Sequence, residues 1–110
     1  MKTIDREAFS SEMGLDGETV KTLYGFFAEE LVQDAADMDA AARQRDGVAF
    51  ARYVHKIKGT SASYHADVLY GCLADADRFC KTGDWPSAFD LAEAIHDAAD
   101  AALREIASWQ

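Results

Sequence analysis

The residues best suited to chemistry lie in one short run, His55-Lys56-Ile57-Lys58-Gly59. A neutral imidazole has a free ring nitrogen near pH 7 and can act as a nucleophile. If the run is helical, Lys58 and Gly59 follow His55 by three and four positions and lie beside its ring. An ammonium in that place could neutralise an anion attached to the ring. The run therefore predicts an anion-handling site centred on His55.

The segment around this run predicts that His55 faces solvent. Its apolar side recurs at steps of three and four, as in one buried face of a helix. The positions on that side are Phe50, Val54, Ile57, Ser61 and Tyr64. At about 100° per residue, His55 points roughly 150° away from the centre of this stripe. A lone histidine is more often an ordinary packing or surface residue, so the functional interpretation depends on the neighbours of His55.

Gly59 strengthens that interpretation. A glycine inside a helix costs about 1 kcal/mol relative to alanine. Because Gly59 is one turn beyond His55 on the same face, its missing side chain would leave the imidazole open to close approach by another protein. The same exposed face would place Arg52, Lys56 and Ala62 at the rim of a docking surface.

Charge is distributed unevenly along the chain. The 110 residues contain 11 Lys and Arg against 20 Asp and Glu, a net charge of −9, whereas residues 43–65 contain five basic residues and one acidic residue. An acidic protein repels a phosphate backbone, so we expect no nucleic-acid partner. The basic segment instead suits a transient contact with an acidic pocket on another protein.

Length and composition indicate a single domain, residues 1–110, located in the cytoplasm. A chain of this length can form one core. No apolar stretch approaches the 18 or so residues that span a bilayer, and the first residues lack the apolar region of a secretory signal. Cys72 and Cys80 would lie roughly 12 Å apart on a helix, which is too far for a disulfide. We therefore expect reduced thiols and no membrane partner.

Helix signals predict the elements that position His55. The chain has one proline and no asparagine, which argues against a fold of many strands. We expect a short helix over 4–13 capped by Thr3, a long helix from Asp16 to about Arg45, helices over 47–64 and 66–81, and a continuous helix from Asp84 to beyond Ile106. Short connections favour antiparallel neighbours. The predicted fold is all-α, an antiparallel up-down four-helix bundle with a short additional N-terminal helix.

Motif and architecture together resemble the histidine-phosphotransfer (HPt) domains of two-component phosphorelays. These domains carry His-x-x-Lys-Gly, then small residues, then an alanine ten to twelve positions after the histidine, which corresponds here to Ala66. The resemblance covers nearly the whole chain. One departure is His65, which stands where the family commonly has glycine. Histidine tolerates a left-handed backbone, so the helix stop can survive.

The resemblance implies a role for each residue of the motif. His55 would be phosphorylated on its outer ring nitrogen, Lys58 would contact the phosphoryl oxygens, and Gly59 would provide clearance. The chain would be a free-standing carrier between receiver domains of response regulators and hybrid histidine kinases, with Mg²⁺ and catalytic carboxylates supplied by the receiver. No Gly-rich phosphate loop is present in the sequence. We expect a monomeric phosphocarrier rather than an enzyme, with no ATP site, cofactor or metal of its own.

Other interpretations fit parts of the sequence. Glu93-Ala-Ile-His96 has the Glu-x-x-His spacing of metal-binding bundles, but such sites need two copies and the chain has one. We expect His96 to be a partly buried packing residue. A second phosphorylation site at His65 would lack the following lysine and glycine. A bundle that binds receivers without transferring phosphate should lack the motif histidine and lysine, yet His55 and Lys58 are both present.

Overall fold

The computed structural model describes residues 2–110, and six helices occur within that range. They are α1 (Arg6–Met13), α2 (Gly17–Arg43), α3 (Gly47–Ser63), α4 (Asp67–Thr82), α5 (Trp85–Asp90) and α6 (Ala92–Trp109). Within residues 2–110 no strand is present, so the predicted all-α class is confirmed.

Aspartate side chains begin the helices at the predicted places. The first turn of a helix leaves backbone N–H groups without partners, and a carboxylate before it can accept from one of them. Asp16 accepts from the Thr19 N–H at 2.8 Å, and Asp46 accepts from the Ala49 N–H at 3.1 Å. These caps fix where α2 and α3 start, and thereby the register of the helix that contains His55.

The prediction that Thr3 caps the first helix is wrong. Asp5 is the cap of α1 and accepts from the Ala8 N–H at 3.0 Å. The backbone N–H groups of Thr3 and Ile4 instead donate to the Glu105 carboxylate of α6, at 2.6 and 3.1 Å. A carboxylate from the other end of the chain is a stronger acceptor than a local hydroxyl. The N-terminal segment is therefore tied to α6.

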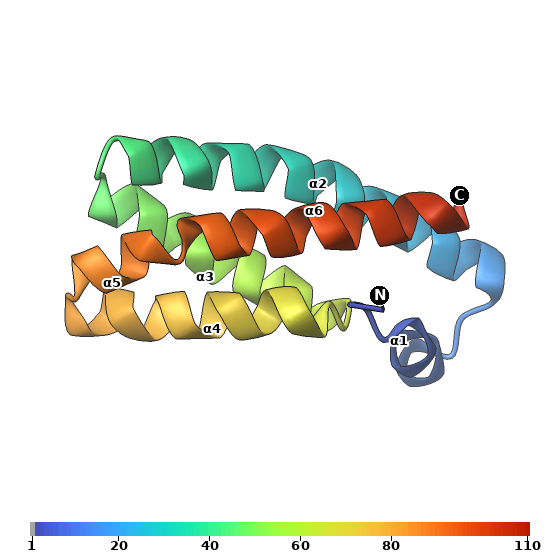
Figure 1. Cartoon of the computed structure of the whole chain (residues 1–110). Helices are drawn as coiled ribbons and strands as arrows, with labels where there is room; N and C mark the ends of the chain where they lie inside the picture. Colours follow the sequence, from blue (N-terminus) through green and yellow to red (C-terminus); the bar gives the residue numbers. More distant parts are fainter. Residues whose placement is uncertain (1) are drawn as a thin grey trace.

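The prediction of one continuous helix after Asp84 is also wrong. The chain turns at Leu91, which separates α5 from α6 (Figure 1). α5 packs against the N-terminal end of α3, where Phe89 lies edge-on to Phe50 with ring centroids 5.1 Å apart. Trp85 lies so close to Gly47 that a Cβ there would be 3.1 Å from its ring. The turn at Leu91 therefore coincides with the packing of Phe89 and Trp85 against α3, and not with a helix-breaking residue.

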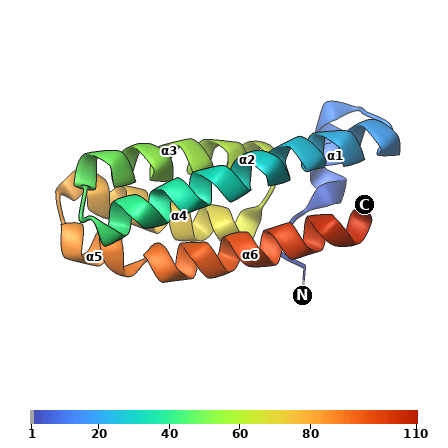
Figure 2. The ribbon, with the colours of Figure 1, turned by 90° about the horizontal axis from the view of Figure 1, so that it is seen from above.

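The four longer helices lie side by side along the long axis of the molecule (Figures 1 and 2). α3 packs between α2 and α4, and α6 contacts both α2 and α4. Following the chain in Figure 1, each of the four runs opposite to the one before it, and α1 lies at the end where α6 finishes. This arrangement leaves one side of α3 uncovered.

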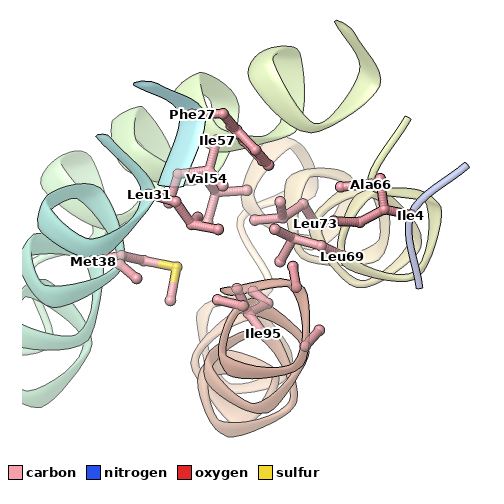
Figure 3. Close-up of a cluster of buried hydrophobic side chains, with 14 of the residues drawn as sticks. Ile4, Phe27, Leu31, Met38, Val54, Ile57, Ala66, Leu69, Leu73 and Ile95 are labelled. Carbon is pink, nitrogen blue, oxygen red and sulfur yellow. The ribbon is translucent and has the colours of Figure 1, made fainter. Parts of the chain in front are cut away.

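A continuous apolar core joins the four helices (Figure 3). Its buried side chains include Phe27, Leu31 and Met38 of α2, Val54 and Ile57 of α3, Leu69 and Leu73 of α4, and Ile95 of α6. The predicted α3 stripe is buried from Phe50 to Ser61, and Tyr64 is partly buried. The predicted core face of α3 is therefore confirmed.

The turn after α3 retains the left-handed residue that the sequence predicts. His65 has φ 57°, and its carbonyl accepts from the Asp5 N–H at 2.9 Å. Its ring forms an ion-pair contact with Glu12 of α1. The Tyr24 hydroxyl donates to the Tyr64 carbonyl at 2.7 Å, which satisfies a carbonyl at the end of α3. Histidine at this position therefore stops the helix and also anchors α1.

His96 does not pack as predicted. Its side chain is about half exposed, and Nδ1 lies 2.8 Å from Asp39 Oδ2 on α2 while Nε2 lies 3.4 Å from Asp100 Oδ2. The hydrogen bond and the charge of Asp39, followed by the charges of Asp100 and Asp97, raise the pKa of His96 above its ordinary value. Within residues 2–110, no group of three or more His, Cys, Asp or Glu side chains is arranged to hold a metal ion. His96 links α2 to α6 by charge.

We predict that His96→Gln lowers the free energy of unfolding more at about pH 5.5 than at about pH 8.5. Because the folded-state pKa is raised, the contribution of the pair is complete below the unfolded-state pKa and is lost as pH rises through the folded-state value. Urea unfolding at the two pH values measures it. In an Asp39→Asn background most of this pH dependence should disappear. An equal loss of stability at both pH values in the wild-type background would contradict the prediction.

Candidate functional site

His55 lies on the uncovered side of α3. Val54 and Ile57 are buried, so the rotation of the helix is fixed and the imidazole points into solvent. The rings of His65 and His96 both contact carboxylates. Of the three histidines in residues 2–110, His55 is the one whose ring nitrogens have no such partner. The exposed ring of His55 is therefore accessible to a second protein.

Gly59 leaves open space one turn beyond His55. A Cβ built at Gly59 would meet no atom within 4 Å outside its own helix backbone, and its backbone is ordinary helix. Nothing in the packing of residues 2–110 therefore requires glycine at that position. Gly71 in α4 is also helical and exposed with open space beside it. Gly71 therefore serves as a matched control for Gly59.

The predicted site residues separate into two groups. Arg52, His55, Gly59 and Ala62 share the exposed face of α3, at steps of three and four. Lys56 and Lys58 leave this face on opposite sides, the first toward α2 and the second toward α4. The structure thus confirms a common face for the first group and gives each lysine an acidic partner that the motif does not contain.

The ammonium of Lys58 is held by Asp77 of α4. Lys58 Nζ lies 3.0 Å from Asp77 Oδ2, and Lys81 Nζ lies 2.9 Å from the same oxygen. The hydrogen bonds from Lys81 and Lys58 keep the pKa of Asp77 below its usual value, despite the burial that opposes this. Asp77 is therefore an anion with two cationic partners beside the candidate site.

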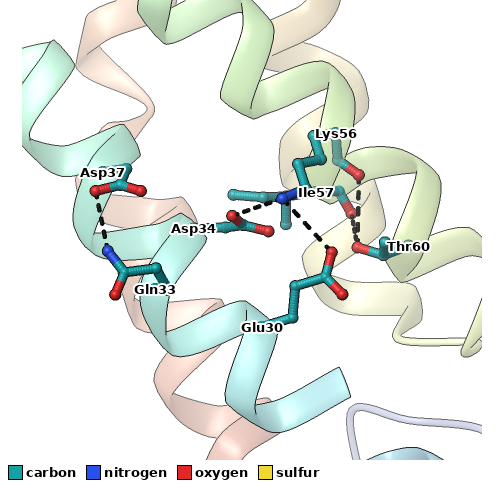
Figure 4. Close-up of polar contacts among 7 residues, drawn as sticks. All are labelled: Glu30, Gln33, Asp34, Asp37, Lys56, Ile57 and Thr60. Atoms are coloured by element: carbon teal, nitrogen blue, oxygen red, sulfur yellow. Dashed lines mark hydrogen bonds and ion pairs between the residues drawn. The ribbon is translucent and has the colours of Figure 1, made fainter. Parts of the chain in front are cut away.

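The ammonium of Lys56 is held by acids of α2 (Figure 4). Lys56 Nζ lies 3.0 Å from Asp34 Oδ1 and 3.6 Å from Glu30 Oε1. The hydrogen bond to Asp34 and the charges of both acids raise the pKa of Lys56. Lys56 is therefore a single cation with two acidic partners, the reverse of the arrangement at Asp77.

The two buried acids, Asp34 and Asp77, were not predicted from the sequence, although the sequence contains a signal for them. Asp34 follows Leu31 by three positions and Asp77 follows Leu73 by four, so both aspartates occupy the apolar face of their helix. Asp and Glu are almost never buried without a partner. An aspartate within an apolar stripe therefore predicts a buried ion pair, although the spacing does not say which cation forms it.

The comparison with protein families identifies the family of the chain. The family model of the Hpt domain matches residues 22–105, a range that contains His55, Lys58, Gly59 and Asp77. The chain therefore belongs to the Hpt-domain family, whose members are phosphocarriers that interact with receiver domains in phosphorelays. Searches of curated proteins and of solved structures found no match. Within residues 2–110, no helix has the length and apolar character needed to cross a membrane.

We predict that Gly59→Ala raises the free energy of unfolding by roughly 0.5–1 kcal/mol, because alanine is the better helix former and its methyl group meets open space. Gly71→Ala should give a similar gain for the same reason. Urea unfolding of both variants measures the effect. A loss of stability in Gly59→Ala alone would show that packing requires this glycine.

Proposed function

We propose that the chain is a phosphocarrier that accepts a phosphoryl group on His55 from a phospho-aspartyl receiver domain and passes it to another receiver. The observation that carries the proposal is the solvent-facing His55 ring, which has no ion-pair or hydrogen-bond partner within residues 2–110 and lies beside the bare surface of Gly59, in a chain of the Hpt family. The histidine is exposed where a second protein can reach it, and the glycine leaves room for that protein.

The chemistry proposed for His55 is an in-line displacement at phosphorus. The lone pair of the outer ring nitrogen forms the P–N bond, while the P–O bond to the aspartate of the receiver breaks and the carboxylate leaves with the electron pair. Lys58 opposes the negative charge on the phosphoryl oxygens. Mg²⁺ and the acidic catalytic residues come from the receiver. This chain supplies the nucleophile, a cation and clearance, without an ATP site.

The proposed docking surface is the exposed face of α3, with Arg52, Gly59 and Ala62 around His55 and Lys56 at its α2 edge. The positive charge of Arg52 there speeds encounter with an acidic receiver pocket, and small residues permit close contact. We assign α2, α3, α4 and α6 to an antiparallel up-down bundle that presents this face. We further propose that the chain acts as a monomer in the cytoplasm.

We predict that the purified protein gains acid-labile, base-stable phosphate when incubated with a phosphorylated receiver domain and Mg²⁺, and that His55→Ala gains none. The expectation follows from the lability of a P–N bond in acid and from the assignment of His55 as the acceptor. Label on the His55→Ala variant would overturn the assignment of the residue. No label on wild type with several receivers would overturn phosphotransfer itself.

We predict that Gly59→Glu abolishes transfer while the helix content stays unchanged. A carboxylate one turn from His55 would block the approach of the receiver and repel its acidic pocket, yet the position has open space for a side chain. Gly71→Glu places the same side chain at an exposed glycine of α4 and should transfer normally. Transfer rates and circular dichroism of both variants measure this. Normal transfer by Gly59→Glu would remove the clearance role.

A further inference from the structure

One carboxylate oxygen beside the site is shared by two ammonium groups. Asp77 Oδ2 accepts from Lys58 of α3 at 3.0 Å and from Lys81, one turn further along α4, at 2.9 Å. The Asp77 side chain is 8% exposed, whereas Lys58 is 26% exposed and Lys81 is 68% exposed. A carboxylate this deeply buried must keep at least one cationic partner, because an uncompensated buried charge is strongly destabilising.

The opposite lysine of α3 is bound in a different way. Within residues 2–110, Lys56 is the ion-pair partner of Asp34, whose side chain is 7% exposed, and Asp34 has no second cation. Release of Lys56 would leave a buried carboxylate unpaired. Release of Lys58 would not, because Lys81 would still neutralise Asp77. Lys58 is therefore the releasable cation and Lys56 the fixed one.

Phosphorylation of His55 would offer Lys58 a second anion. Lys58 is three positions after His55 on the same helix, so its flexible side chain can reach the space beside the imidazole. The negatively charged phosphoryl oxygens would then compete with Asp77 for the same ammonium. The outcome of this competition changes the free energy of the phosphorylated state.

We propose that Asp77 is a positioning residue that regulates the phosphoryl site: it holds Lys58 against α4 while His55 is unmodified, and yields Lys58 to the phosphoryl group while Lys81 takes over the carboxylate. The inference rests on the proposed function, since it needs a phosphoryl group on His55. The strength of the Asp77 contact then sets how far the transfer equilibrium favours this chain over the receiver.

The test is the equilibrium constant for phosphoryl transfer from a phosphorylated receiver to this chain, with both phosphorylated species quantified by ³¹P NMR. Asp77→Asn keeps the size of the side chain but removes its charge, so Lys58 is free and the constant should rise about threefold to tenfold. Lys81→Ala leaves Lys58 as the remaining partner of Asp77, so the constant should fall. In a Lys58→Ala background, Asp77→Asn should have no effect.

Asp77→Asn and Lys81→Ala test the inference separately, so the result does not depend on the folding of one variant. If Asp77→Asn loses its helical circular dichroism, Lys81→Ala still carries the test, because it alters an exposed side chain and predicts the opposite sign. A constant that is unchanged or lowered in folded Asp77→Asn, or unchanged in Lys81→Ala, would overturn the inference while leaving phosphotransfer by His55 intact.

A second measurement separates this inference from the proposed function. In unmodified wild-type protein, the ammonium signals of Lys58 and Lys81 in ¹H–¹⁵N spectra should show protection from solvent exchange, and both should lose it in Asp77→Asn. On phosphorylation, the Lys58 signal should shift while Lys81 stays protected. If no variant gains phosphate on His55 although the ammonium signals are protected, the proposed function fails and the inference fails with it.

Discussion

Burial of one stripe of α3 is the constraint on which the rest of the site depends. Phe50, Val54 and Ile57 are each at most 1% exposed, and burial of such a side chain contributes about 1.5–3 kcal/mol. An ion pair with a buried carboxylate gains little net free energy, because the cost of removing the charges from water offsets their attraction. Apolar packing therefore decides the rotation of α3, and the charged contacts adjust to it. Once the stripe is buried, helix geometry alone turns His55 outward and sends Lys56 and Lys58 to opposite neighbours.

The lysines of α3 belong to two ion-pair clusters, and the two clusters have opposite composition. At α2 one lysine meets two acids, and at α4 one acid meets two lysines. The first arrangement fixes a cation, whereas the second allows one of its cations to leave without stranding a buried charge. Two of the five basic residues of 43–65, Lys56 and Lys58, are thus paired with acids on the flanks of α3, and positive charge on the exposed face itself comes from Arg52.

Much of the fold and the centre of the site could be predicted from the sequence because they depend on local rules. Asp16 and Asp46 are helix caps, Gly83 has φ 75° at the end of α4, and the outward direction of His55 follows from the spacing of its apolar neighbours. The partners of the lysines could not be predicted by spacing, because Asp77 lies on another helix 19 positions from Lys58. For the same reason the sequence did not predict that Glu105 would bind the N-terminal segment, or that ring packing would accompany the turn at Leu91.

His65 joins two features that at first look unrelated. It replaces the glycine common in the Hpt family at the end of the site helix, and it contacts α1, which lies outside the matched residues 22–105. Histidine adopts a left-handed backbone less readily than glycine does. Its ring, however, contacts Glu12, and its carbonyl accepts from the Asp5 N–H. Glycine at position 65 could stop the helix equally well but would offer no ring to Glu12. Through this turn residue, α1, which lies outside the residues matched by the family model, is attached at the C-terminal end of the helix that bears His55.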